Sequence, residues 1–431
     1  MNPLSLVFIV ALSVALLLRL WLSLRQARHV RAYRDQVPAP FAADIDLAAH
    51  RKAADYTVAK GKLGRLSLVL DFVVVLIWTL GGGLTALDDL WRDLGLSTLN
   101  TGVLMIGSFA VVNALIGLPL SLYSTFGIEA EFGFNRTTWR TWVMDLLKVL
   151  LLALALGLPL LYAALTLMQK AGNLWWLYLW ALWFGFSLAL TWAYPKFIAP
   201  LFNKFSPLSD AELKARIESL LTRCGFTSRG VFVMDGSVRS AHGNAYFTGF
   251  GSNKRIVFFD TLMASLTHQE IEAVLAHELG HFKLHHVIQR LAVTAVSGLA
   301  GLALLGWLFG QDWFYMGLGV AAPSSYMALL LFTLLLPPFL LLLEPLGSAW
   351  SRRHEFEADA YARAQSDGAA LARALVKLYR ENASTLTPDP LHSAFYDSHP
   401  PALIRIARLQ EPSQAQSGVQ PRQEGSHKAT P

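Results

Sequence analysis

The residues best suited to chemistry are His277, Glu278 and His281, which stand in the run HELGH at 277–281. On a helix, residues four apart share a face, so the two imidazoles can bind one metal ion. The carboxylate of Glu278 then reaches the open position of that ion, where it can take a proton from a zinc-bound water and pass it to a leaving amine. The spacing therefore predicts peptide hydrolysis with one Zn²⁺ per chain.

The surrounding sequence predicts the helix that must carry this motif. Thr267 and Glu270 form a capping-box pattern, which starts a helix near His268 and puts the motif about two turns inside it. Gly280, a poor helix former, leaves room for another backbone to approach closely. The apolar residues that would form the buried stripe of this helix are Ile271, Val274, Leu275 and Leu279.

The composition predicts an integral, multi-pass membrane protein. The chain has 431 residues, of which 54% are hydrophobic and 15% charged, and its mean hydropathy is +0.41. That is too apolar for a soluble protein of this size, and about 20 apolar residues are needed to cross a bilayer. We expect about seven spans in an all-α membrane bundle, at 4–24, 66–87, 103–126, 149–168, 174–193, 291–309 and 326–343.

The charge pattern predicts orientation rather than nucleic-acid binding. The net charge is +6, and nine Lys or Arg residues lie between the first two windows, from Arg25 to Arg65, whereas the next loop has only Arg92. By the positive-inside rule the N-terminus is outside and the HELGH helix is cytoplasmic. The first window lacks a cleavage site and is a retained anchor, in which Arg19 is expected to snorkel to the interface.

Two regions and a tail are expected along the chain. Residues 1–200 form a transmembrane region of five spans, and 201–411 form a small α+β zincin-like metalloprotease domain that includes the HELGH helix, two further spans and the Glu355 helix. A capping box from Ser209 to Glu212 opens an amphipathic helix that Gly225 ends. Residues 412–431 are expected to be disordered. Short strands are predicted at 231–234, 245–250 and 255–259, and one helix at 352–380.

A catalytic zinc commonly needs a third protein ligand, and several candidates follow the motif. His285 shares a face with the first histidine but lies about 12 Å from it on a straight helix, too far for one ion. An acidic stretch after the last window carries Glu355, Glu357 and Asp359. Glu355 and Asp359 share a helix face, so one could bind the metal and the other could orient a histidine. Spacing alone does not choose among the three acids.

Several separated stretches resemble one known family. HELGH is followed about seventy residues later by SRRHEFEADAYA, and both match the integral-membrane gluzincins of the type 1 CAAX prenyl protease family. The resemblance runs from the first window to about Leu409. It also rests on the stretches GIEAEFGFNRTTWRTW, YPKFIAPLFNKFSPL, SAHGNAYFTGF and SHPPALIRI.

The resemblance implies a role for each central residue. His277, His281 and Glu355 would bind zinc, and Glu278 would be the general base. Asp359 matches the acidic residue that the family uses as a proton donor, although holding one of the zinc histidines is an equally good physical role.

The resemblance also implies roles for residues around the metal. His399 would stabilise the tetrahedral oxyanion, the alternative being a loop histidine that caps a turn. Asn244, Ala245 and Tyr246 match a strand that pairs with substrate backbone. Arg405 matches an arginine near the substrate, which a surface salt bridge explains nearly as well.

The family likeness implies a fold and a leading function. The fold would be a ring of seven helices around an intramembrane chamber. The sequence departs from the family pattern at His354, where an aromatic residue is expected. The leading function is a zinc endopeptidase that cuts near the C-terminus of prenylated or membrane-associated proteins. The alternative is a quality-control protease that degrades misfolded or stalled membrane proteins. A structural zinc in a transporter or scaffold is disfavoured, because the chain has a single cysteine.

The expected partners follow from the same reading. They are a peptide or lipidated protein substrate and the lipid bilayer. We expect no binding to nucleic acid, and we expect the protein to be a monomer. The membrane would be a bacterial inner membrane, or the endoplasmic reticulum in a eukaryotic host, with the active site facing the cytoplasm.

Overall fold

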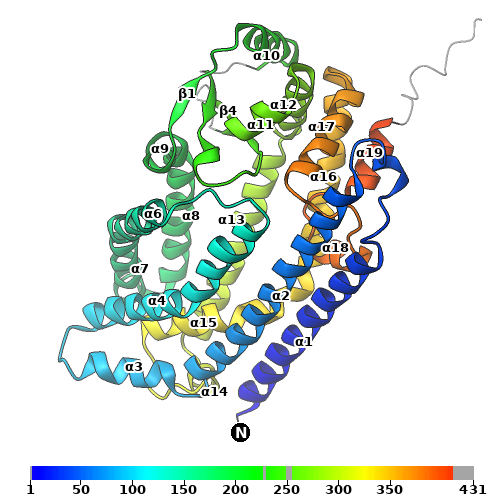
Figure 1. Cartoon of the computed structure of the whole chain (residues 1–431). Helices are drawn as coiled ribbons and strands as arrows, with labels where there is room; N and C mark the ends of the chain where they lie inside the picture. The colour runs from blue at the N-terminus through cyan, green and yellow to red at the C-terminus, as the bar shows by residue number, and fades with distance from the viewer. Residues whose placement is uncertain (1, 227–229, 249–254, 411–431) are drawn as a thin grey trace, which may run out of the picture.

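The computed structural model describes residues 2–226, 230–248 and 255–410, and these are mainly helical (Figure 1). Six described helices are long and apolar enough to cross a membrane, or seven if a bent pair counts as one span. The predicted multi-span helical fold is therefore confirmed. These helices are α1 (Pro3–Ala32), α2 (Leu47–Trp78) with α3 (Gly83–Arg92), α4 (Thr98–Leu122) continued by η2 (Tyr123–Ile128) and α5 (Glu129–Glu131), α6 (Trp139–Leu152) continued by η3 (Ala153–Gly157) and α7 (Leu158–Lys170), η4 (Gly172–Leu174) with α8 (Trp175–Ala193), η5 (Tyr194–Ile198) and α9 (Ala199–Phe202), α13 (His286–Leu308), and α15 (Ser325–Leu340) continued by η7 (Leu341–Leu343) and α16 (Glu344–Gln365).

The second span is bent inside the window predicted at 66–87. Helix α2 ends at Trp78, α3 begins at Gly83, and the two axes differ by 50°. Gly82 has a φ of 78°, a left-handed conformation that glycine adopts without the Cβ penalty. The three consecutive glycines at 81–83 therefore lie at the break between the two helices.

Arg19 forms an ion pair that the sequence did not predict. Its Nη2 lies 2.8 Å from Glu344 Oε1, which ties α1 to the first turn of α16. Pairing two ionisable groups lowers the penalty of holding either one near the membrane. No local pattern marks this pair, because the two residues lie 325 positions apart in sequence. The position of Arg19 at the membrane interface stays a prediction.

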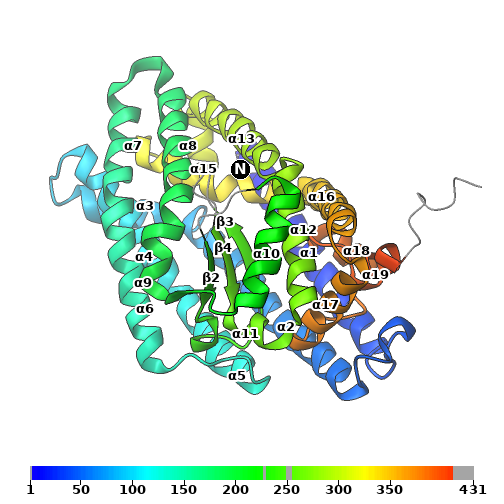
Figure 2. The ribbon, with the colours of Figure 1, turned by 90° about the horizontal axis from the view of Figure 1, so that it is seen from above.

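A four-stranded sheet lies at the end of the molecule opposite the N-terminus (Figure 1). Its order is β1 (Phe205–Pro207), β2 (Val231–Met234), β4 (Arg255–Phe259) and β3 (Ala245–Thr248), in which β2 and β4 are parallel and the other pairs antiparallel. The strands predicted at 231–234 and 255–259 are confirmed. Residues 249 and 250 of the predicted third strand lie outside the described residues, and β1 was not predicted. Figure 2 shows α10 (Ala211–Cys224) and α12 (His268–Lys283) beside this sheet.

Local capping signals set the ends of the helices beside the sheet. The capping box of Thr267 and Glu270 is present at the start of α12, as predicted. Helix α10 begins one residue later than predicted, because Asp210 rather than Ser209 accepts the hydrogen bond from Leu213. Gly225, with a φ of 71°, ends α10 as expected.

The helix predicted over 352–380 is two helices. Helix α16 ends at Gln365, and Asp367 accepts the backbone N–H of Ala369 to cap α17 (Gly368–Glu381). The chain thereby folds back beside α12. Shorter described elements are η1 (Ala39–Phe41), α11 (Asp260–Ser265), η6 (Gly236–Val238), α14 (Asp312–Gly317), α18 (Pro390–Tyr396) and α19 (Ala402–Gln410).

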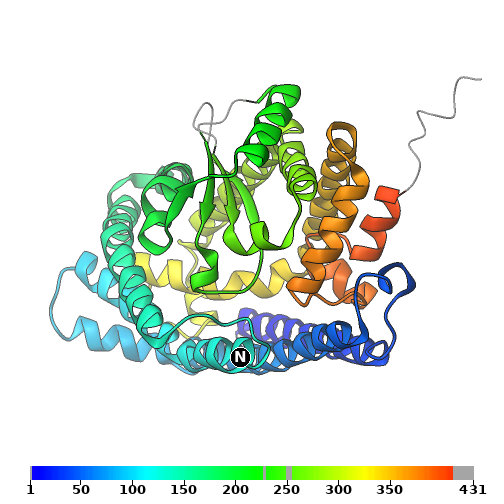
Figure 3. The ribbon, with the colours of Figure 1, turned by 45° about the horizontal axis from the view of Figure 1, so that its top comes forward.

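Three clusters of buried apolar residues hold the described parts together. The first joins the sheet, α10, α12, α17 and α19, and the second joins the membrane helices α1, α4, α7, α13 and α15. A small third cluster joins α2, η2 and the segments that follow α5 and α17. In Figure 3 the green strands and the orange helices lie on the same side of the long blue helices α1 and α2. Helices α12 and α16 lead from the first cluster toward the second. The predicted disordered tail at 412–431 lies outside the described residues.

Candidate metal centre

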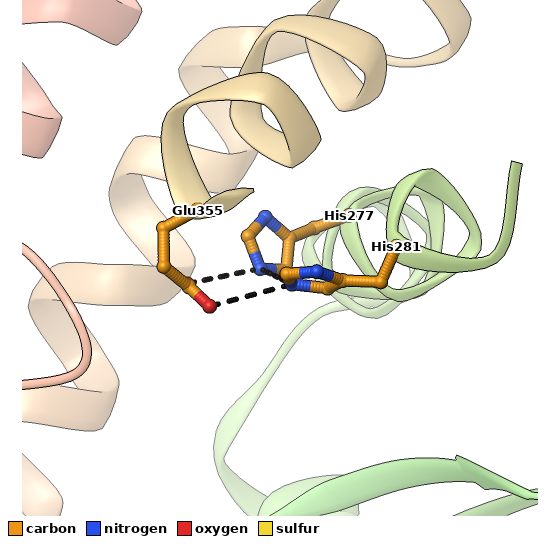
Figure 4. Close-up of side chains that lie close together, drawn as sticks. All are labelled: His277, His281 and Glu355. Carbon is orange, nitrogen blue, oxygen red and sulfur yellow. Dashed lines mark hydrogen bonds and ion pairs between the residues drawn. The ribbon is translucent and has the colours of Figure 1, made fainter. Parts of the chain in front are cut away.

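His277, His281 and Glu355 point toward one another from two packed helices (Figure 4). The two Nε2 atoms lie 3.2 Å apart, and each lies 3.4 Å from a carboxylate oxygen of Glu355. Bonds of about 2.0 Å at tetrahedral angles would separate ligand atoms by roughly 3.3 Å. The two Nε2 atoms thus have the spacing of two corners of a zinc tetrahedron, and each faces a different oxygen of Glu355 at 3.4 Å.

Close packing of α12 against α16 creates this spacing. A Cβ added at Gly280 would lie 3.0 Å from Ala358 Cα, which is closer than ordinary side chains allow. Glycine at this position lets the two backbones approach, as the sequence predicted. Glu355 then meets the imidazoles one helical turn apart on α12.

Glu355 behaves as a group built to hold a cation. Its side chain is buried, and Oε2 makes no hydrogen bond of acceptable geometry, although His399 Nδ1 lies 2.7 Å away. A buried carboxylate oxygen that makes no hydrogen bond is costly unless a nearby cation satisfies it. Of the three acids left open by spacing, Glu355 alone faces both imidazoles, because Glu357 pairs with His286 and Asp359 with the outer side of His277.

His277 is held from behind by a buried ion pair. Its Nδ1 lies 2.9 Å from Asp359 Oδ1, and Arg405 donates to both oxygens of Asp359 at 2.6 and 2.9 Å. Arg405 is only 5% exposed, so the surface salt bridge considered from the sequence is wrong. Burial lowers the pKa of His277, but its hydrogen bonds with Asp359 and Glu355 raise it to about 9. Asp359 thus fixes the orientation of the His277 ring from the side that faces away from Glu355.

The other two polar candidates are accessible to solvent. Glu278, next to His277 on α12, is partly exposed and makes no hydrogen bond or ion pair within the described ranges, so its carboxylate is available. His399 has a side chain 62% exposed and contacts the cluster through Glu355.

The segment Asn244, Ala245 and Tyr246 leads into the edge strand β3. The backbone carbonyl of Asn244 accepts from Phe259 N at 3.0 Å, and β3 pairs on that side with β4. Its other side pairs with no strand among the described residues. An edge of this kind carries unpaired backbone groups that an extended peptide can use.

Sequence reasoning missed the residue that fixes the start of this strand. Asn382, at the end of α17, accepts from Gly243 N at 3.0 Å and donates to Gly243 O at 3.3 Å. The paired acceptor and donor of one amide thereby clamp the backbone just before Asn244. No local pattern marks Asn382, because the contact joins residues 139 positions apart.

Two of the stretches that carry the family resemblance contact each other. Arg136 N donates to Arg239 O at 3.1 Å, Ala241 N donates to Phe134 O at 3.0 Å, and Asn135 pairs with Ser240. The loop after α5 is thus bonded to the segment that precedes β3. The edge strand is fixed to the membrane helices as well as to the metal helix.

Two family models together match most of the chain. The model described as CAAX prenyl protease N-terminal, five membrane helices, matches residues 26–204, and that of peptidase family M48 matches residues 207–413.

Individual proteins match over similar lengths. CAAX prenyl protease 1 of Saccharomyces cerevisiae is 35% identical over 85% of this chain and 86% of its own length. A CAAX prenyl protease 1 homolog of Arabidopsis thaliana is 41% identical over 68% of this chain and 69% of its own. The crystal structure of S. mikatae Ste24p is 32% identical and superposes with a TM-score of 0.88 over 95% of this chain and 100% of that chain.

Proposed function

The chain belongs to the CAAX prenyl protease 1 family of M48 peptidases, and we propose that His277, His281 and Glu355 hold the zinc ion with which it works. It is a membrane metallopeptidase that processes CAAX proteins. The observation that carries the zinc proposal is the convergence of the two Nε2 atoms, 3.2 Å apart, on the carboxylate of Glu355, whose two oxygens lie 3.4 Å from one nitrogen each. When bound, zinc would polarise the scissile carbonyl and lower the pKa of water to roughly 7.

Four side chains of the protein then each have a separate role in the reaction. Glu278 accepts a proton on the open side and returns it to the leaving amine. His399, beside Glu355, donates a hydrogen bond to the oxygen on which negative charge develops. Asp359 accepts the Nδ1–H of His277 and so keeps Nε2 directed at the metal, which favours a positioning role over proton donation. Arg405, buried against Asp359, holds that carboxylate rather than the substrate.

The free side of β3 is the proposed place for the substrate backbone. Asn244, Ala245 and Tyr246 would pair with an extended peptide, with Asn382 holding the start of the strand. Backbone pairing of this kind reads the shape of a peptide rather than its side chains. The lipid on the substrate must then be sensed by the membrane helices.

The protein's setting follows from its charges. We propose that residues 1–200 form the five-span region and residues 201–411 the zincin-like domain. The protein would be a monomer that binds no nucleic acid, and its active site would face the cytoplasm. The supporting observation is the excess of Lys and Arg between the first two spans. The membrane is a bacterial inner membrane in a prokaryotic host and the endoplasmic reticulum in a eukaryotic one. The comparisons do not favour the quality-control alternative.

Matched peptides test the function. Purified protein is incubated with one CAAX peptide in farnesylated and unmodified form, and the products are mapped by mass. Cleavage after the prenylated cysteine is expected, whereas cleavage of unfolded, unmodified chains alone would contradict the proposal. Glu278→Gln is expected to retain metal and lose about 10²- to 10⁴-fold in rate, the range that general acid–base catalysis contributes. Unchanged cleavage by that variant would remove Glu278 from the mechanism.

A further inference from the structure

The two metal-binding histidines have different partners on their outer sides. His277 Nδ1 meets a carboxylate, Asp359 Oδ1, at 2.9 Å. His281 Nδ1 instead meets another imidazole, His286 Nδ1, at 3.0 Å, and His286 Nε2 lies 3.0 Å from Glu357 Oε2. We propose that His286 is a positioning residue for His281, through which Glu357 acts on the metal ligand; this rests on the zinc site of the proposed function.

The contacts are compatible with one consistent arrangement of protons. When Nε2 of His281 faces the metal, its proton must be on Nδ1, which then donates to Nδ1 of His286. In that arrangement His286 has its own proton on Nε2 and donates it to Glu357. Each ring nitrogen has one role, and neither imidazole needs to be charged. The chain therefore keeps Nε2 of His281 free of a proton and pointed at Glu355.

An unusual backbone turn brings His286 into contact with His281. Residues five apart on a continuous helix point in directions roughly 140° apart, so their side chains diverge. Here α12 ends at Lys283 and α13 begins at His286, with His285 between them at a φ of 60°. A residue with a Cβ rarely adopts this left-handed conformation. The turn returns the ring of His286, which is 1% exposed, to the outer side of His281.

His354 holds the ring plane of His286. The two rings stack with centroids 3.9 Å apart and an angle of 5° between their planes. Trp350 packs against His354 edge-on, and His354 Nε2 lies 3.1 Å from Gln289 Oε1. His354 thus fills the place where the sequence comparison expected an aromatic residue, and it does so as a flat packing surface. The next residue on α16, Glu355, faces the proposed metal site.

The same three residues could be taken for a second metal site, because donor atoms of His286, His354 and Glu357 lie within 4.8 Å of one another. The stacking argues against it. A histidine binds metal in the plane of its ring at about 2.0 to 2.1 Å, and two parallel planes share no such point. Both nitrogens of His286 are also already hydrogen-bonded. The positioning role uses all of these contacts, whereas a metal would break them.

Zinc release from the full-length protein in detergent tests the proposal. His286→Leu removes the acceptor, and His286→Gln restores one. We expect zinc transfer to a chromophoric chelator to speed up about 10- to 100-fold in His286→Leu, the usual effect of losing such a partner, with partial recovery in His286→Gln. The Co²⁺-substituted protein should show a shifted visible spectrum in His286→Leu. Wild-type release and spectrum in a folded His286→Leu protein would overturn the proposal.

Glu357 provides the second variant if the buried change prevents folding. Its side chain is 38% exposed, so Glu357→Leu should fold and release zinc several-fold faster. The matched control is Arg353→Ala, which removes the other partner of Glu357, at 2.8 Å, without touching His286. Wild-type release in Glu357→Leu, or a second bound zinc that is lost in His286→Leu, would overturn the proposal. Because zinc is the readout, a protein that cleaves no CAAX peptide would refute only the proposed function.

Discussion

Two of the three glutamates of helix α16 lie in contrasting surroundings, one at the proposed metal site and one at the membrane end. Glu355 is 2% exposed and lies within 3.6 Å of His277, His281, His399 and Arg405. Glu344 has a side chain 32% exposed and pairs with Arg19 alone. The metal end is a set of mutually fixed polar atoms, whereas the membrane end relies on one ion pair and apolar surface. Activity should therefore be sensitive to single-atom changes at Glu355 and should tolerate such changes at Glu344.

The sharpest test of this contrast makes the same substitution at both ends. Glu355→Gln removes a charged ligand and should lower zinc content and peptide cleavage by more than about a hundredfold, beyond the usual effect of an outer partner. Glu344→Gln weakens a partly exposed pair, which is worth at most about 1 kcal/mol, and should keep zinc and activity. Metal analysis and mass-mapped cleavage measure both. Equal effects of the two variants would erase the distinction.

The next largest effect is expected at Asp359. Asp359→Asn leaves Arg405 buried without its main counter-ion, which should destabilise the protein by about 3 kcal/mol. It also weakens the support of His277, so zinc affinity should fall about 10- to 100-fold. Chelator competition and thermal unfolding measure the two effects. Asp367→Asn is the control, because asparagine caps a helix as well as aspartate does; an equal loss there would count against a specific role.

A smaller effect is expected where the substrate strand is clamped. Asn382→Ala removes both hydrogen bonds to Gly243 and should raise KM by about tenfold, the equivalent of one lost hydrogen bond, with little change in kcat. Asn382→Asp keeps the acceptor for Gly243 N and should fall between. Steady-state kinetics on one peptide separate the two constants. A fall in kcat at constant KM would place Asn382 in the chemistry instead.

The smallest effect is expected on the membrane surface. Leu151, at the end of α6, is 64% exposed and lies in a span of which only 6% is buried against protein. Leu151→Ala should change the free energy of unfolding by no more than about 0.5 kcal/mol and leave cleavage unchanged. Leu330→Ala, buried among the membrane helices, is the destabilised reference. Equal losses of stability in the two variants, measured in the same detergent, would show that Leu151 is buried against another surface.

Local signals predicted the elements better than their contacts. The capping box of Thr267, the stop at Gly225 and the apolar windows are short-range features, and the structure confirms them. The bend after Trp78 was missed although three glycines mark it, because length and apolarity also fit a continuous span. The break at Asp367 was missed for a similar reason, since Ala-rich sequence on both sides favours helix.

The site could be predicted only as far as spacing and family likeness reach. The pair His277 and His281 follows from helix periodicity, whereas spacing left Glu355, Glu357 and Asp359 open. The partners of His281 depended on the left-handed turn at His285, which no propensity predicts for a histidine. Asn382 and the pairing of Asp359 with Arg405 are contacts between distant segments. Packing decides such contacts, and a single sequence does not contain their geometry.

The proposed metal ligands lie on both sides of helices α13 and α15. His277 and His281 precede α13 and α15, and Glu355 follows them. A ribosome that has made the HELGH helix has therefore not yet made the residue that completes the cluster. We therefore expect the nascent chain to lack a complete metal site, and with it peptidase activity, until Glu355 has been synthesised.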